Sequence, residues 1–406
     1  MVIGDIILVA ASLLGLALLL NPRVLKWRSW RATVTPLASI IGSGFLVAGP
    51  ILSQTAGVWA FAAMLGLCAV GYYYGSAIRH NIAFVEPGLE QHAPGVVVGI
   101  EEASRIALSL AYFVSVTYYL NLFSAFALRS GNIVDDFWIR VVATAVIAFI
   151  GILGLLRGLG ALEKVETFAV GLKLSLIGAL CLALLVVSFL ALKGGEFSWP
   201  AVSHDAGIQE IQVLLGLVIL VQGFETSRYL GDEYDTKLRI KTMRHAQWIS
   251  TGIYLVFIVL ITRYFTTNFS GAGEETAIID LLRPVGILVA PLIITVALAS
   301  QLSAAVADMN GAGGLISETS RKKVSVRWGY LITASVAVVI TWSANIYEII
   351  TYASKAFVLY YGLQSLQAAL SALRIGGAYA VLKAAFYGAG VLLALVIVIF
   401  AIPAGV

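Results

Sequence analysis

Charged residues stand inside several segments that are otherwise apolar, and they are the first candidates for chemistry. Lys173, Glu225, Arg228 and Lys355 all lie within such segments. A charge at mid-bilayer costs about 2.5–3.5 kcal/mol on insertion scales, so residues of this kind usually serve a substrate, an ion or a proton, or an internal ion pair. The four histidines and two cysteines show no metal-ligand spacing, and no nucleophile elbow or phosphate loop is present. The residues therefore favour transport over enzymatic chemistry, with no cofactor, metal or nucleic-acid partner expected.

The elements that position these residues are membrane helices. The chain has 406 residues, of which 60% are hydrophobic and 12% charged, and its net charge is +4; its mean hydropathy is +0.94. This composition is typical of an integral membrane protein, for which a spanning helix needs about 20 residues. We expect twelve helices, at 6–20, 34–55, 57–76, 106–128, 137–156, 167–192, 211–230, 247–265, 285–307, 329–343, 347–372 and 379–403.

The basic residues orient these helices. With residues 23–31 in the cytoplasm, 18 of the 26 Lys and Arg fall on the cytoplasmic side, 5 on the opposite side and 3 within apolar runs. The positive-inside rule expects this bias. It predicts a multi-pass protein of the cell membrane with both termini outside the cytoplasm, and its oligomeric state cannot be derived from the sequence.

The segment 35–52 is apolar but is interrupted by Gly42-Ser43-Gly44. Each glycine costs about 1 kcal/mol in a helix interior. An opened turn in a membrane helix is tolerated where it is buried in protein or lines a cavity, and such turns mark ligand sites. The alternative is that the glycines only let two helices pack closely.

A second interruption opens the second half of the chain. The segment 211–230 carries Gly223, followed by Glu225 to Arg228, at a position matching the first interruption. Five helices precede this segment within the core and five begin with it, so the two halves should be inverted relative to each other. We expect an extra N-terminal helix and basic linker at 1–32, repeats at 33–192 and 193–372, and a C-terminal helix at 373–406.

The sequence around both interruptions resembles the amino acid–polyamine–organocation (APC) superfamily. Residues 40–50, IIGSGFLVAGP, are similar to its first core helix, and residues 222–233, QGFETSRYLGDE, to its sixth. Lys173 stands where many members carry a lysine in the fifth core helix. The resemblance covers roughly 33–372 and implies a transporter with a leucine-transporter-type fold. Residues 300–320 differ from the amino-acid permease pattern, which indicates a distant branch.

The candidate cargo site lies at the two interruptions. The N-terminus of the half-helix 45–52 would bind an anion such as a carboxylate, and the carbonyls ending 35–41 would attract a cation. Glu225 would contact a cargo amine or carry a proton, or would instead pair with Arg228, three residues on. The predicted substrate-binding residues are Ile41, Gly42, Ser43, Gly44, Tyr112, Tyr119, Gln222, Gly223, Phe224, Glu225 and Ser354.

Each of the remaining candidates could have a purely structural role instead of a role in the site. Tyr112 and Tyr119 share a face with Ser115 and would either cover the site or pack in the core. Lys355 would line the pathway or pair with Glu348, and Arg228 is a second pathway charge. Asp308 is expected near the end of its helix, in contact with solvent.

Lys173 is the candidate for proton coupling. In the transporters that the chain resembles, this lysine reaches the break of the first core helix and takes the place of sodium. The carbonyls ending 35–41, together with Ser303, would hold its ammonium, and Glu225 would be a second proton carrier. The alternative is that the lysine extends to the membrane interface.

Taken together, these residues predict a secondary transporter for a small amino acid, amine or related solute, coupled to protons and working by alternating access. Two alternatives stay open: an inorganic cation transporter on the same fold, and a membrane sensor or subunit that keeps the scaffold without transporting.

Overall fold

The computed structural model describes residues 2–42, 44–89, 94–199, 207–231, 233–265 and 274–404, except for the side chains of Val2, residues 160–169 and Glu274. All of the regular structure in these residues is helical. Ten segments are long and apolar enough to cross a membrane, namely Arg28–Thr55, Gly57–Phe84, Gly95–Arg129, Asp136–Arg157, Val170–Lys193, Thr236–Thr262, Val289–Thr319, Val326–Ser343, Ile346–Ile375 and Ala380–Phe400.

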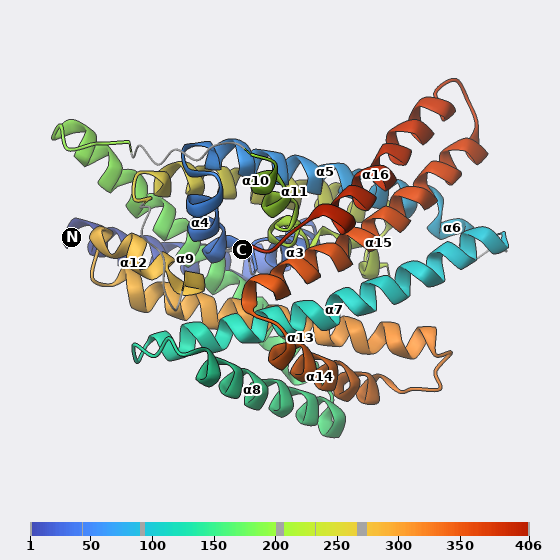
Figure 1. Cartoon of the computed structure of the whole chain (residues 1–406), viewed down its shortest axis with the longest axis horizontal. Helices are drawn as coiled ribbons and strands as arrows, with labels where there is room; N and C mark the ends of the chain where they lie inside the picture. Colours follow the sequence, from blue (N-terminus) through green and yellow to red (C-terminus); the bar gives the residue numbers. More distant parts are fainter. Residues whose placement is uncertain are drawn as a thin grey trace.

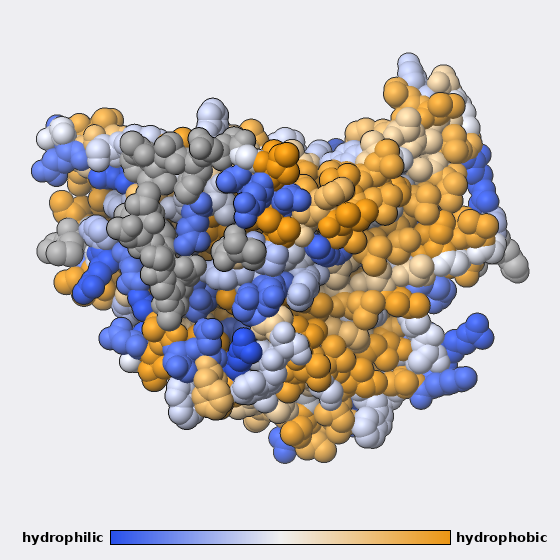
Figure 2. Space-filling model, viewed as in Figure 1, coloured by the Kyte–Doolittle hydropathy of each residue, from blue (hydrophilic) through white to orange (hydrophobic). Residues whose placement is uncertain are grey.

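These segments match ten of the twelve predicted helices. The other two are α1 (Val2–Leu19), a shorter apolar helix, and the region 211–230, which is not a continuous helix. Figure 2 shows apolar side chains over much of the right half of the visible face, while hydrophilic side chains lie mainly on the left half, near the centre and at the right rim.

The first half of the core begins with a helix in two pieces, and four continuous helices follow. Short helices join them at the ends. In chain order the elements are α2 (Pro22–Lys26), α3 (Arg28–Ile40), α4 (Gly44–Thr55), η1 (Gly57–Trp59), α5 (Ala60–Phe84), α6 (Glu86–Leu89), α7 (Gly95–Arg129), α8 (Asp136–Arg157) and α9 (Gly160–Lys193).

The second half repeats this plan. Its elements are α10 (Ile208–Leu215), η2 (Val218–Val221), η3 (Phe224–Leu230), α11 (Thr236–Thr262), η4 (Glu274–Thr276), α12 (Ile278–Leu282), η5 (Arg283–Val285), α13 (Val289–Thr319), α14 (Val326–Ser343) and α15 (Ile346–Ile375), and α16 (Ala380–Phe400) follows the core.

Packing between the halves reveals their symmetry. Helix α5 packs on α11, α7 on α13 and α8 on α14, so each of these helices contacts its own counterpart. The contact of α9 with α13 has its counterpart in the contact of α15 with α7. Figure 1 shows α7, α8, α13 and α14 side by side along the long axis. The fold is therefore the predicted inverted repeat of five plus five helices.

Glycines let the counterpart helices approach closely and reveal their direction. A Cβ on Gly151 of α8 would lie 2.5 Å from Ala334 of α14, and one on Gly154 would lie 2.8 Å from Tyr330. The higher residue on one helix meets the lower residue on the other, so the two run antiparallel. Inverted repeats require this relation between counterparts.

Two helices lie outside the symmetric core. Helix α16 packs on α15, and α1 packs on α9, where Gly15 of α1 meets Ser175. Asp5 links the first turn of α1 to the start of α13. Its carboxylate accepts hydrogen bonds from the backbone N–H groups of Ile287 (3.2 Å) and Leu288 (2.9 Å), just before α13. This carboxylate completes the N-terminus of a neighbouring helix.

Candidate functional site

The first helix break lies between α3 and α4, as predicted. Helix α3 ends at Ile40, two residues form a turn, and α4 begins at Gly44; Ser43 lies outside the described residues. A Cβ on Gly44 would come within 2.6 Å of both the Cα and the carbonyl oxygen of Leu220. Glycine at 44 is thus required for a close backbone approach between two helices.

The second break is confirmed but is longer than predicted. Regular α-helix stops at Leu215, eight residues before Gly223, and the chain continues as the 3₁₀ segments η2 and η3. Ser354 of α15 closes the gap, since its hydroxyl donates to the Gly216 carbonyl (2.6 Å) and accepts from the Ile219 N–H (3.0 Å). The structure therefore places Ser354 against the broken backbone.

The two breaks face each other. Gly223 has φ +113°, and a Cβ there would lie 2.5 Å from the Ser39 hydroxyl and 2.7 Å from the Ile40 nitrogen. Tyr254 of α11 joins the breaks, because its hydroxyl lies 3.0 Å from the Ile40 carbonyl and 2.6 Å from the Leu220 carbonyl. Tyr254 is not among the residues predicted for the site, since one tyrosine in an apolar helix carries no local signal.

Glu225 is fully buried at the second break. Its Oε2 atom accepts hydrogen bonds from the Gly223 N–H (2.9 Å) and from the Tyr361 hydroxyl (2.8 Å). Its Oε1 atom has no hydrogen-bond partner among the described residues. The predicted pair with Arg228 is wrong for this structure, because the Glu225 side chain folds back onto the start of its own 3₁₀ helix.

Arg228 instead points to carboxylates from other elements. It lies 2.9 Å from Glu101 of α7 and 3.4 Å from Glu86 of α6, and it also donates to Gln364 of α15. Arg239 of α11 shares Glu86, at 2.7 Å. These five residues, here called the ion network, join four helices to η3 beside the second break.

Aromatic side chains cover the second break. The Phe224 ring stacks on Tyr361 at 4.9 Å, and Tyr361 stacks in turn on Tyr74 at 5.3 Å. Gln222 donates from its amide nitrogen to the Tyr119 hydroxyl at 2.8 Å, while its buried Oε1 has no partner among the described residues. The structure therefore brings Tyr119, Gln222 and Phe224 to the break.

Tyr112 lies two turns before Tyr119 on α7. Its ring contacts Phe357 edge-on at 6.0 Å and packs against Gly311. One turn on, Ser115 donates to the Asp308 carboxylate. Asp308 is 5% exposed, so the expectation that it contacts solvent is wrong. The reason is that α13 continues to Thr319, twelve residues beyond the predicted end.

Lys173 is 2% exposed and reaches the first break. Its ammonium donates to the Ala38 carbonyl at 2.6 Å, within the last turn of α3. The expected hydroxyl of Ser303 is not the one that binds the break; Ser300, one turn earlier on α13, donates to the Gly42 carbonyl. The lysine therefore extends inward to the carbonyl end of a half-helix, and not to the membrane interface.

Lys355 stands apart from these contacts. It is half-buried on α15, and no ion pair joins it to Glu348 in the described part of the chain. Glu348 is engaged elsewhere, because its carboxylate accepts from the Asn345 N–H (2.8 Å) in a capping box at the start of α15. The predicted Lys355–Glu348 pair is wrong for this reason.

Gln301 is a further candidate for the site, and the sequence did not reveal it. It is fully buried next to Ser300, and neither end of its amide has a hydrogen-bond partner among the described residues. It lies two helical turns before Asp308 and so shares the face of α13 that meets α7. Buried amides are rarely left unpaired, which makes Gln301 a candidate for contact with cargo.

Several polar groups at the breaks have no protein partner among the described residues. No group of three His, Cys, Asp or Glu side chains in the described chain could hold a metal ion. The free acceptors are single oxygens of Glu225, Gln222 and Gln301, and the opened N-terminus of α4 supplies N–H groups.

Comparisons with known proteins agree with this architecture. The chain is 42% identical over 366 residues to an uncharacterized protein of Aquifex aeolicus (strain VF5), with 89% of each chain covered. It superposes with a TM-score of 0.54 and 14% identity on a Na⁺-coupled sialic acid symporter in a substrate-bound, outward-open state, covering 99% and 98% of the two chains. Residues 22–401 match the family described as APC superfamily transporter. The protein therefore belongs to the APC superfamily of transporters.

Proposed function

We propose that the protein moves a small amino acid, amine or related organic solute across the cell membrane by alternating access, coupled to protons. The orientation in this proposal has both termini outside the cytoplasm. The observation that carries it is the Lys173 ammonium on the Ala38 carbonyl at the first break. A cation there stabilises the carbonyl end of α3, and loss of its proton weakens that contact.

Cargo chemistry follows from the unpaired groups. A cargo ammonium fits the free Oε1 atoms of Glu225 and Gln222, both of which are acceptors buried at the second break. A cargo carboxylate fits the first turn of α4, where backbone N–H groups point out of the helix. The two ends of a zwitterion are thereby recognised by opposite breaks.

The inorganic cation alternative is less well supported because the carbonyls that it needs are occupied. Lys173 takes the Ala38 carbonyl, Ser300 takes that of Gly42, and Tyr254 takes those of Ile40 and Leu220. The sodium coupling of the sialic acid symporter belongs to that protein, and at 14% identity the likeness carries only the fold.

Uptake by purified protein in liposomes tests the proposal. With radiolabelled amino acids and amines, we expect uptake driven by an inward proton gradient without sodium. Lys173→Ala should abolish the response to the gradient, while Lys193→Ala, at the exposed end of the same helix, should retain it. Sodium-driven uptake by wild type, or unchanged proton dependence in Lys173→Ala, would refute the coupling.

A sensor is distinguished from a transporter by comparing the binding of cargo with its movement into liposomes. Cargo that raises the melting temperature but never enters liposomes under any gradient would favour a sensor that keeps the scaffold.

A further inference from the structure

A crevice on the outer side of the core has no role in the proposed transport cycle. It lies where α1, outside the symmetric core, leaves a gap against α3, α9 and α11. The gap holds a cavity of about 330 Å³, which is open to the outside and lined by apolar groups. Its outer rim includes Gly178 of α9 and Gly252 and Val256 of α11, all exposed.

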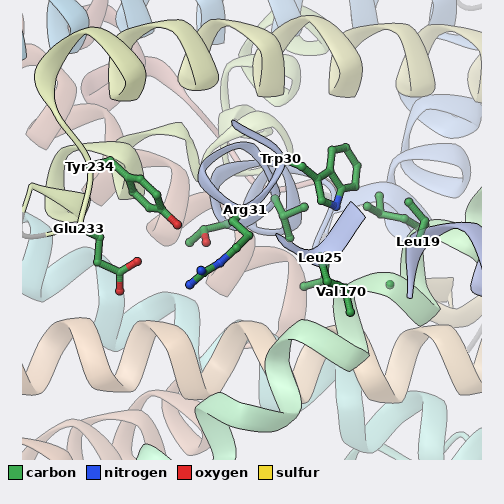
Figure 3. A pocket seen from close by; sticks show the side chains of 11 residues that line it. Leu19, Leu25, Trp30, Arg31, Val170, Glu233 and Tyr234 are labelled. Carbon is green, nitrogen blue, oxygen red and sulfur yellow. The ribbon is translucent and has the colours of Figure 1, made fainter. Parts of the chain in front are cut away.

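A second cavity continues the crevice toward the basic segment before α3. It measures about 210 Å³ and shares Leu19, Trp30 and Leu174 with the first. Its lining turns polar, with Arg31, Glu233 and Tyr234 at the mouth. Figure 3 shows the Arg31 guanidinium and the Glu233 carboxylate at one end, and the apolar side chains of Leu19, Leu25 and Val170 at the other.

The dimensions match one lipid chain. Along α9 the crevice runs from Val170 to Cys181. At 1.5 Å per residue this is about 16 Å. Half of the hydrocarbon core of a bilayer is about 15 Å. The apolar part therefore spans one leaflet, with Trp30 at its polar end, where tryptophan is enriched in membrane proteins.

The charge at the mouth selects the headgroup. Four exposed basic residues, Arg23, Lys26, Arg28 and Arg31, lie on α2 and the start of α3. None of them forms an ion pair with a carboxylate in the part of the chain that the structure describes. Glu233 lines the same mouth, and its carboxylate would repel an anion, so a phosphate would have to lie on the Arg31 side. Basic clusters at a membrane surface attract anionic lipids.

We propose that this crevice binds one anionic glycerophospholipid, with its phosphate at Arg31 and an acyl chain between α9 and α11. The proposal is independent of cargo and coupling. The bound chain would contact Leu37 and Leu174, the neighbours in sequence of Ala38 and Lys173. The lipid thus supports, from the membrane side, the two helices that Lys173 joins.

Native mass spectrometry of the detergent-purified protein, titrated with phosphatidylglycerol, tests the acyl site. A Cβ on Gly178 or Gly252 would meet no atom within 4 Å, and both residues line the cavity, so we expect a leucine there to be accommodated and to occupy part of the crevice. The control is Gly66→Leu on α5, which is also exposed and also free of contacts. We expect Gly178→Leu and Gly252→Leu to lose the single tightly bound lipid and Gly66→Leu to retain it. Equal retention by all three would overturn the acyl site.

The headgroup is tested with two charge variants and two competitors. Arg31→Gln should weaken phosphatidylglycerol binding about fivefold, the effect of one arginine at a membrane surface, whereas Arg23→Gln, outside the crevice, should change it less. Phosphatidylcholine should compete poorly, and inorganic phosphate should not compete at all. Displacement by inorganic phosphate would show a free-anion site, and equal binding of phosphatidylcholine would overturn the anionic preference.

Discussion

The Tyr254 hydroxyl is a single group that serves two half-helices. Its position explains how carbonyl groups at both breaks find a hydrogen-bond donor inside the membrane. It lies within hydrogen-bond distance of the Ile40 carbonyl at the end of α3 and of the Leu220 carbonyl in η2. A hydroxyl donates only one proton, so it binds one carbonyl at a time or shares the proton between them. Relative motion of the breaks can therefore transfer this bond from one helix to the other.

Removing that hydroxyl should destabilise the fold. We expect Tyr254→Phe to lower the free energy of unfolding by about 1–3 kcal/mol, because a buried carbonyl loses its donor. The measurement is the melting temperature in detergent. Tyr352→Phe is the control, since Tyr352 is 46% exposed on α15. Identical melting temperatures for the two variants would contradict the bridging role.

Glu225→Gln tests charge while keeping shape. A glutamine can still accept from the Gly223 N–H and the Tyr361 hydroxyl through its oxygen, so the melting temperature should change little. Transport should fall by about tenfold or more, because an ammonium loses its anionic partner, worth roughly 1.5–3 kcal/mol. Glu196→Gln, in the exposed loop after α9, is the control. Normal uptake by Glu225→Gln would remove this residue from cargo recognition.

At the residue scale, the sequence predicted those groups whose type is unusual for their surroundings. A lysine, a glutamate or a glycine pair in an apolar run stands out without a structure, and Lys173, Glu225 and Gly42 to Gly44 were found that way. The ion-pair partners of these groups were harder to predict. Arg228 pairs with Glu86 and Glu101, more than 120 residues away, instead of with its neighbour Glu225.

At the scale of elements, the close approach of the two broken helices depends on glycine at both contact points. Gly44→Ala should prevent it, because the Cβ would overlap the Leu220 backbone, which cannot move aside as a side chain can. We expect a large fall in melting temperature or in folded yield, measured by size-exclusion chromatography. Gly66→Ala, with open space around it, should fold at least as well as wild type. A stable, monodisperse Gly44→Ala would show that the breaks can separate at little cost.

Hydropathy predicted the number and order of the elements because a membrane helix has a length set by the bilayer. It did not predict their ends. Helix α7 begins eleven residues before the predicted start at 106, because the charged residues Glu101, Glu102 and Arg105 interrupt its apolar run. Helix α13 continues twelve residues beyond 307, through a polar and glycine-rich stretch that carries little apolar signal. The length of the second break was missed for another reason: residues 216–221 are apolar, and it is Ser354 that allows them to leave the α-helix.

At the scale of the whole molecule, the ion network ties η3 to α6, α7, α11 and α15 on the side rich in basic loops. For the pathway to open there, Arg228 must leave Glu101 or move together with it. A buried pair is costly to break from one side only, because the remaining charge is left without its partner. The network is therefore expected to hold this end of the protein closed.

A double-mutant cycle measures the coupling between Arg228 and Glu101 on which that closure depends. We expect Arg228→Met and Glu101→Gln each to destabilise the protein, and the double variant to be less unstable than the sum by about 0.5–3 kcal/mol. Melting temperatures of the four proteins give the coupling. The cycle Arg239→Met with Glu102→Gln serves as reference, because those two residues share no contact. Strict additivity in the first cycle would mean that the pair does not hold the end closed.

The position of Ser354 in the chain also has a consequence for synthesis. It follows Gly216, whose carbonyl it binds, by 138 residues, and Tyr254 follows Ile40 by 214. At about 5–20 residues per second, a ribosome takes roughly 7–28 s to supply the first of these partners. During that interval, residues 216–221 have entered the membrane without the hydroxyl that later satisfies their backbone. The nascent segment must therefore remain helical, or remain sheltered by the insertion machinery, and the break in it forms only after α15 arrives.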